Sequence, residues 1–348
     1  MFPFVERIPM NRLPLATLSM VLFISAGRVL AADSEALVLV KTIPLKGVAG
    51  KLDHLAVDVR GERLFVANKP NNTLDIVDLK AGKLVRQITD QGKVSGVDYA
   101  PDLDIIYVGN GAGFCNAFDG KDYKPVFSTP ASNADNVHYH SGIKTVYVGQ
   151  DEILSALDAK TGAIKATIKL PGAVHGFKID EPAGKIYGVL TKPNLIAVVD
   201  IARNEVIEKF DLTLSDAGSP IAQDASNGLL FVGCPKKQPM VIVFDSSTGK
   251  EIASVEIPAG IDDIHFDSRR NRLYASCSDS ALAVIEKKGD KYQVVARLDT
   301  PKDSRTCAWS MGKLYLGVPV QPGKDAPEIR VYEARPAIET TAASGQAK

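Results

Sequence analysis

One unit of about 40 residues recurs seven times along this chain, and that repetition limits the possible folds more than any other feature. An aromatic residue inside an apolar stretch marks each unit. The seven anchors are Phe65, Tyr107, Tyr147, Tyr187, Phe231, Tyr274 and Tyr315. They are 42, 40, 40, 44, 43 and 41 residues apart. Periods of this length are typical of repeat architectures in which every repeat is one supersecondary unit.

Each unit has the pattern of four short strands separated by turns. In the first unit the strands are expected near 55–58, 63–68, 73–78 and 84–88, where apolar and polar residues alternate. Gly82 lies between the last two and supplies the positive φ of a tight hairpin. Four strands in 40 to 44 residues is the length of a propeller blade. We therefore predict an all-β fold, a seven-bladed β-propeller of four-stranded blades.

The last unit is incomplete, because it stops at its third strand, 329–332. Residues 37–43 look like a fourth strand and have no other partner. We expect this N-terminal strand to pair with the last unit and close the ring, which removes an open sheet edge. The propeller then forms one domain over 32–336. The small, polar residues 337–348 are expected to be a disordered tail.

The amino terminus has the pattern of a secretory signal. Arg7 and Arg12 precede an apolar run over 13–24, and small residues follow near Ala31. The run is shorter than the roughly 18 residues that a membrane span needs. We predict a signal peptide over 1–31, with a start at Met1 or Met10, and a periplasmic or secreted protein without a membrane span after cleavage. A retained anchor is the alternative.

The charge balance limits the possible binding partners, and the positions of the cysteines limit the possible disulfides. Lys plus Arg (41) equals Asp plus Glu (41), and removal of 1–31 leaves 38 against 40. No bulk basic patch is available for nucleic acid, so we expect no such partner. We also expect the protein to be a monomer. Cys234 and Cys277 align with Asn68 in neighbouring blades, on the order of 10 Å apart, which exceeds the roughly 7 Å Cα limit of a disulfide. We predict four free thiols.

Several units carry a motif that resembles a known family. The stretches are Leu64-Phe65-Val66-Ala67-Asn68, Ile106-Tyr107-Val108-Gly109-Asn110 and Val146-Tyr147-Val148-Gly149-Gln150, each followed by a strand that ends in Asp. Over about 35–335 the chain resembles the YVTN-repeat (YncE-like) propellers, although the fourth and seventh units lack the polar residue that ends the motif. The resemblance implies the fold and says little of activity, since propellers include binding proteins, lyases, lactonases and dehydrogenase subunits.

The loops that precede the innermost strands form one rim of a propeller's channel. Alignment of the units brings together Asp53-His54, Ser95-Gly96, Asp135-Asn136, His175-Gly176, Ser219-Pro220, Asp262-Asp263 and Arg305-Thr306. We predict a ligand-binding rim made of His54, Asn136, His175, Asp263 and Arg305. Arg305 offers a fixed cation for a carboxylate or phosphate, and His54 in the adjoining blade could protonate or polarise the ligand.

Two residues further along each innermost strand, a second set of positions is expected to face the channel. They are Ala56, Asp98, His138, Lys178, Ala222, His265 and Ala308. Their sequence neighbours are apolar and are expected to pack between blades. Lys178 and His265 are the predicted channel residues. A solvated channel lined with polar side chains, without a ligand, is the simpler alternative.

Catalytic and metal-binding interpretations are also open. Asp98 could orient His138 as a general base, but a structural hydrogen bond explains the pair more simply. His138 and His140 have a spacing that metal ligands use. His140, however, aligns with four aspartates that cap the first turn, which leaves His138 and His265 as metal candidates. No other cofactor is indicated, because Gly109–Gly113 resembles a dinucleotide loop but precedes no helix pattern.

Two functions therefore compete at the rim. The first is an exported propeller that binds a small polar or anionic ligand, or another exported protein. The alternative is a metal- or His-dependent hydrolase or lyase, similar to a lactonase. The sequence leaves open whether the protein is an enzyme. Nucleic-acid binding is the weakest hypothesis, because a basic stripe with stacking aromatics is missing.

Overall fold

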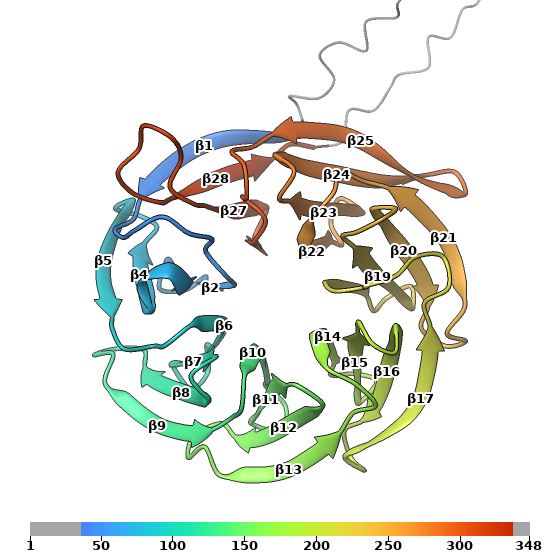
Figure 1. Ribbon diagram of the computed structural model, residues 1–348, viewed down its shortest axis with the longest axis horizontal. Helices are drawn as coiled ribbons and strands as arrows, with labels where there is room; N and C mark the ends of the chain where they lie inside the picture. The colour runs from blue at the N-terminus through green and yellow to red at the C-terminus, as the bar shows by residue number, and fades with distance from the viewer. Residues whose placement is uncertain (1–35, 337–348) are drawn as a thin grey trace, which may run out of the picture. The chain divides into compact units, whose positions relative to one another are not determined.

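The computed structural model describes residues 36–336. In this part of the chain, 28 strands form seven antiparallel four-stranded sheets arranged in a ring (Figure 1). The predicted seven-bladed β-propeller is therefore confirmed. The signal peptide predicted for 1–31 and the tail predicted for 337–348 lie outside the described residues. No helix in 36–336 is long and apolar enough to span a membrane.

The first three blades follow one another along the chain. Their strands are β2 (Leu55–Asp58), β3 (Arg63–Asn68), β4 (Thr73–Asp78), β5 (Lys83–Ile88), β6 (Val94–Ala100), β7 (Ile105–Asn110), β8 (Phe114–Asp119), β9 (Pro125–Pro130), β10 (Ala134–His140), β11 (Thr145–Gln150), β12 (Ile153–Asp158) and β13 (Ile164–Lys169). One 3₁₀ turn, η1 (Lys69–Asn71), joins β3 to β4.

The remaining blades repeat the same order. Their strands are β14 (Val174–Asp180), β15 (Lys185–Leu190), β16 (Leu195–Asp200), β17 (Glu205–Asp211), β18 (Ile221–Asp224), β19 (Leu229–Cys234), β20 (Met240–Asp245), β21 (Glu251–Glu256), β22 (Ile261–Asp267), β23 (Arg272–Cys277), β24 (Ala281–Lys288), β25 (Lys291–Asp299), β26 (Cys307–Ser310), β27 (Lys313–Val318), β28 (Glu328–Ala334) and β1 (Leu37–Pro44).

The N-terminal strand closes the ring as predicted. β1 pairs antiparallel with β28, so the seventh blade has the order β26, β27, β28, β1 (Figure 1). Ile43 pairs with Ile329, and Leu37 pairs with Ala334. Strands from opposite ends of the described chain thus share one sheet, and this pairing removes the edge that β28 would otherwise expose.

The core lies between neighbouring blades, where the middle strands are buried on both faces. The seven aromatic anchors all belong to second strands, and each is at most 6% exposed. Outer strands such as β5 are partly exposed along their length. This difference in burial explains why the motif around each anchor is almost wholly apolar, whereas apolar and charged residues alternate along the fourth strands.

Aspartates fix the tight turns at the ends of the strands. Asp78 and Asp158 accept hydrogen bonds from backbone N–H groups of the turns that follow them, and Gly82 and Gly162 adopt positive φ there. At the end of the innermost strand, His140 accepts from the Gly142 N–H at 3.2 Å, the role that aspartates have in other blades. The turn-capping interpretation of His140 is confirmed.

One expectation about packing is wrong. Ala56, Ala222 and Ala308 are buried in apolar clusters between blades and do not line the channel, because their side chains are too short to extend past the strand edge. Trp309 is only partly buried and stacks on Tyr274, with ring centroids 4.3 Å apart. The cysteine prediction holds, since Cys115, Cys234, Cys277 and Cys307 are all free and buried.

Candidate functional site

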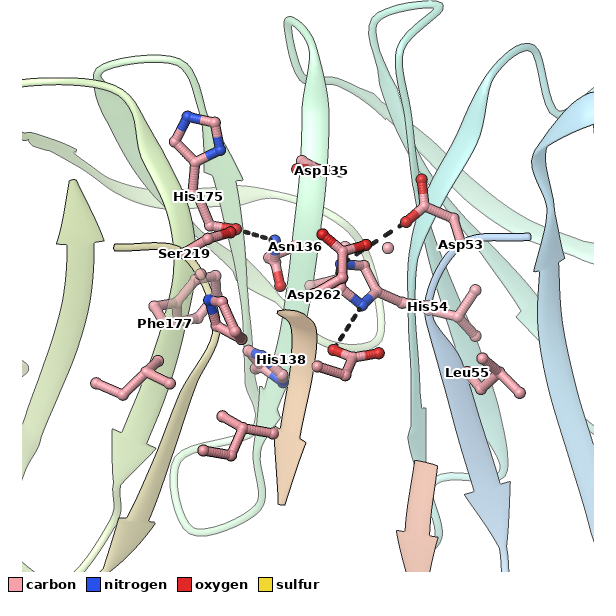
Figure 2. A pocket seen from close by; sticks show the side chains of 18 of the residues that line it. Asp53, His54, Leu55, Asp135, Asn136, His138, His175, Phe177, Ser219 and Asp262 are labelled. Atoms are coloured by element: carbon pink, nitrogen blue, oxygen red, sulfur yellow. Dashed lines mark hydrogen bonds and ion pairs between the residues drawn. The ribbon is translucent and has the colours of Figure 1, made fainter. Parts of the chain in front are cut away.

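A polar cavity of about 310 Å³ lies at the rim and upper part of the channel (Figure 2). All seven blades contribute residues to its lining. The five predicted rim residues, His54, Asn136, His175, Asp263 and Arg305, all line it. It also reaches the deeper residues His138, Lys178 and His265. The structure therefore brings the two predicted rings of polar residues into one cavity, with Asp98 outside its lining.

Three cations in the lining are paired with carboxylates. Lys69 Nζ lies 2.6 Å from Asp53 Oδ2, and Arg305 Nε lies 3.1 Å from Asp262 Oδ2. His54 Nδ1 lies 3.3 Å from an oxygen of Asp263. We expected Arg305 and His54 to offer a free positive charge to an anion. Their charges are instead partly neutralised by Asp262 and Asp263, which the alignment had placed at the same rim.

The pKa values in this group follow from burial and charge. Burial alone would lower the pKa of His54, but Asp263, Asp53 and Asp135 together raise it to about 10. His54 is therefore a cation at neutral pH. Burial would raise the pKa of Asp263, yet the charge and hydrogen bond of His54 lower it below the usual range. Burial raises the pKa of Asp262 to about 6 although Arg305 opposes the change.

Several of the polar side chains tie one blade to the next. The Asn136 amide donates to the backbone oxygen of His175 at 2.6 Å (Figure 2). Asp263 accepts from the Cys307 N–H at 2.9 Å, and His265 Nε2 lies 2.9 Å from the Cys307 carbonyl oxygen. These bonds satisfy strand-edge groups that would otherwise face the channel unpaired. Part of the polar lining therefore has a structural role, whatever else it does.

Asp98 and His138 do not form the expected hydrogen-bonded pair. Asp98 Oδ2 lies 4.0 Å from His138 Nδ1. Both carboxylate oxygens of Asp98 instead accept backbone N–H groups, from Tyr99 at 2.8 Å and Tyr139 at 2.7 Å. Burial raises the pKa of Asp98 to about 6. Asp98 thus has a structural role as the acceptor of two backbone N–H groups, and its carboxylate does not fix the orientation of the His138 imidazole.

The histidine lies against an aromatic ring. His138 packs edge-on against Phe177 with centroids 4.7 Å apart, and burial together with the positive charge of Lys178 lowers its pKa well below the usual range (Figure 2). A neutral imidazole at this depth can accept a proton from a bound molecule or become charged when an anion is near.

The donor atoms suited to a metal differ from the predicted set. Asp263, His265 and Cys307 place one ligand atom each within 4.8 Å of one another, whereas His138 is not in this group. Burial raises the pKa of the Cys307 thiol far above its usual value, and Asp263 adds to this effect. The sequence analysis did not consider Cys307 as a residue of the channel, so its place beside Asp263 and His265 was not anticipated.

Lys178 differs from the other cations of the cavity. It comes from β14 in the fourth blade and is partly buried. Among residues 36–336 no carboxylate oxygen lies within 4.0 Å of its ammonium. Burial lowers its pKa, and the more distant Asp263 and Asp98 raise it in part. His175 lies near the start of the same strand, at the outer rim of the cavity, and its side chain is exposed.

No protein-family model matches this chain, and no curated protein matches it in sequence. The geometry of the cavity is therefore the basis for the function proposed below.

Proposed function

We propose that the protein is an exported propeller of the YVTN-repeat (YncE-like) kind that binds a small polar ligand in the cavity at its channel. The observation that supports this most is the convergence of all seven blades on one polar cavity of about 310 Å³. Ligand pockets typically begin near 300 Å³. The size favours a small molecule, and a segment of another exported protein is the second kind of ligand that the rim could accept.

Differences between blades favour ligand binding over a merely solvated channel. Folding requires only that each blade repeat the same apolar pattern, yet equivalent rim positions carry His54, Asn136, His175, Asp263 and Arg305. Loops held by a rigid scaffold commonly supply such position-specific polar groups. Asn136, His54 and Asp263 are already held in place by hydrogen bonds or ion pairs, so the cavity would meet a ligand with little loss of side-chain entropy.

The test is a screen of small polar metabolites by thermal shift, followed by calorimetry on the hits. We expect His175→Ala to weaken binding at least severalfold, because its exposed ring lines the cavity and its removal leaves the inter-blade bonds intact. Arg60→Ala, on an exposed turn at the opposite end of β2, is the matched control. Loss of binding in the control with retention in His175→Ala would contradict this site.

A hydrolase or lyase is the second candidate, and one observation favours it. Asp263, His265 and Cys307 could together hold a divalent metal. Asp263 and His265 already form hydrogen bonds with the backbone of Cys307, and these bonds compete with metal binding. We therefore rank this function below ligand binding. Elemental analysis of the purified protein separates the two. A stoichiometric metal that disappears in Cys307→Ser would favour the enzyme, and absence of metal after loading with zinc would exclude this metal site.

A further inference from the structure

Two charged side chains of the cavity lining, Lys178 and Asp135, form no ion pair within 4.0 Å in residues 36–336, and Lys178 is the unpaired cation. Each of the other cations has its own carboxylate, namely Lys69 with Asp53, Arg305 with Asp262 and His54 with Asp263. Within residues 36–336, Lys178 has no such partner within 4.0 Å and donates no hydrogen bond to protein. A partly buried ammonium without a counter-ion loses hydration that nothing in the fold replaces.

Two histidines lie at the same level of the channel as Lys178. His138, Lys178 and His265 occupy equivalent positions on their strands, because each pairs directly with its blade's aromatic anchor, Tyr147, Tyr187 and Tyr274 respectively. All three side chains line the cavity. Three nitrogen groups from the third, fourth and sixth blades therefore face a common space below the rim.

The acids facing this space are already engaged. The titratable groups that influence the three nitrogen groups are Asp98 on β6, Asp263 on β22 and His54 before β2. Both carboxylate oxygens of Asp98 accept hydrogen bonds from backbone N–H groups. Asp263 is shared between His54 and the Cys307 N–H. An added anion would thus find a cation that no carboxylate of the fold contacts directly.

We propose that Lys178, assisted by His138 and His265, binds the anionic group of the ligand, a carboxylate or a phosphate, in the deep part of the cavity. This inference rests on the proposed function and names the charge of the ligand and the residue that holds it. The rim cations Arg305 and His54 then position the ligand's remaining polar groups and do not supply the main anchor, because their charge is already offset.

Anion binding at this place is coupled to proton uptake. Burial and the nearby positive charge of Lys178 lower the pKa of His138 well below its usual range, so its imidazole is neutral near pH 7. An anion beside Lys178 favours protonation of His138, whose ring then carries a positive charge next to the anion.

The experiment is calorimetric titration of the full mature protein with inorganic phosphate and, separately, with malonate. We expect Lys178→Met to weaken binding of the better probe by about 10- to 100-fold, the usual worth of a charge-assisted hydrogen bond. Lys69→Met is the matched control, since Lys69 lines the same cavity but is paired with Asp53, and it should change affinity only severalfold. Lys178→Arg should retain binding, and Lys178→Gln replaces Lys178→Met if the latter does not fold.

Proton coupling gives a second readout. Binding should be tighter at about pH 6 than at about pH 8, and titrations in buffers of different ionisation enthalpy should show net proton uptake. Equal affinities of wild type and Lys178→Met, or binding of neither probe by the wild type, would overturn the inference. A neutral polar ligand that needs His175 but not Lys178 would leave the proposed function intact and refute only this assignment.

Discussion

The ion pair between His54 and Asp263 makes a quantitative prediction about stability and pH. His54 is partly buried, with 22% of its side chain exposed, and its pKa is raised from 6.5 to about 10. Because the folded-state pKa lies above the unfolded one, the stabilisation is complete below about pH 6.5 and is lost as pH rises through about 10. At about 1.4 kcal/mol for each unit of difference, the upper limit is on the order of 5 kcal/mol.

The assay is denaturant unfolding at a series of pH values, followed by the fluorescence of the sole tryptophan, Trp309, and by circular dichroism. Between about pH 7 and 9 the free energy of unfolding of the wild type should fall by about 1.4 kcal/mol per pH unit more steeply than that of His54→Gln. Cysteine ionisation in the unfolded chain contributes equally to both proteins and cancels in the difference. Parallel curves for the two proteins would refute the raised pKa.

Three further predictions concern the fold. Deletion of residues 37–44 removes β1 and exposes the edge of β28, so we expect loss of cooperative unfolding and aggregation, whereas an unchanged melting curve would contradict closure by this strand. Alkylation without reductant should modify four thiols in denaturant and almost none in the native state, since all four cysteines are free and buried. Fewer than four modified thiols in denaturant, measured by mass spectrometry, would reveal a disulfide. Asp98→Asn should cost about 1–3 kcal/mol, because the amide oxygen can accept only one of the N–H groups of Tyr99 and Tyr139 and the amide nitrogen cannot accept the other. The exposed Asp325→Asn should change stability by less than about 0.5 kcal/mol.

The fold could be predicted because it depends on local patterns that repeat. Each aromatic anchor marks a buried second strand, and the missing last strand left residues 37–43 with one place to pair. The turn-capping role of His140 followed from its alignment with aspartates. These features need no knowledge of distances across the ring.

The site was only partly predictable, because its chemistry depends on contacts between blades. Alignment placed Arg305 and Asp262 at one rim, but not at the 3.1 Å separation that neutralises the guanidinium. It treated Ala56 like Lys178, although only a long side chain reaches the channel from that position. It did not consider Cys307 and so missed its place beside Asp263 and His265.

The central claim, that the channel cavity is a ligand-binding site, is tested most directly by NMR of the histidine side chains during titration with a polar metabolite found by screening. The chain has five histidines, of which His54, His138, His175 and His265 line the cavity and His140 does not. We predict that binding shifts the ring signals of the cavity histidines and leaves that of His140 unchanged. A saturable binder that moves only His140, or none of the five, would contradict the account.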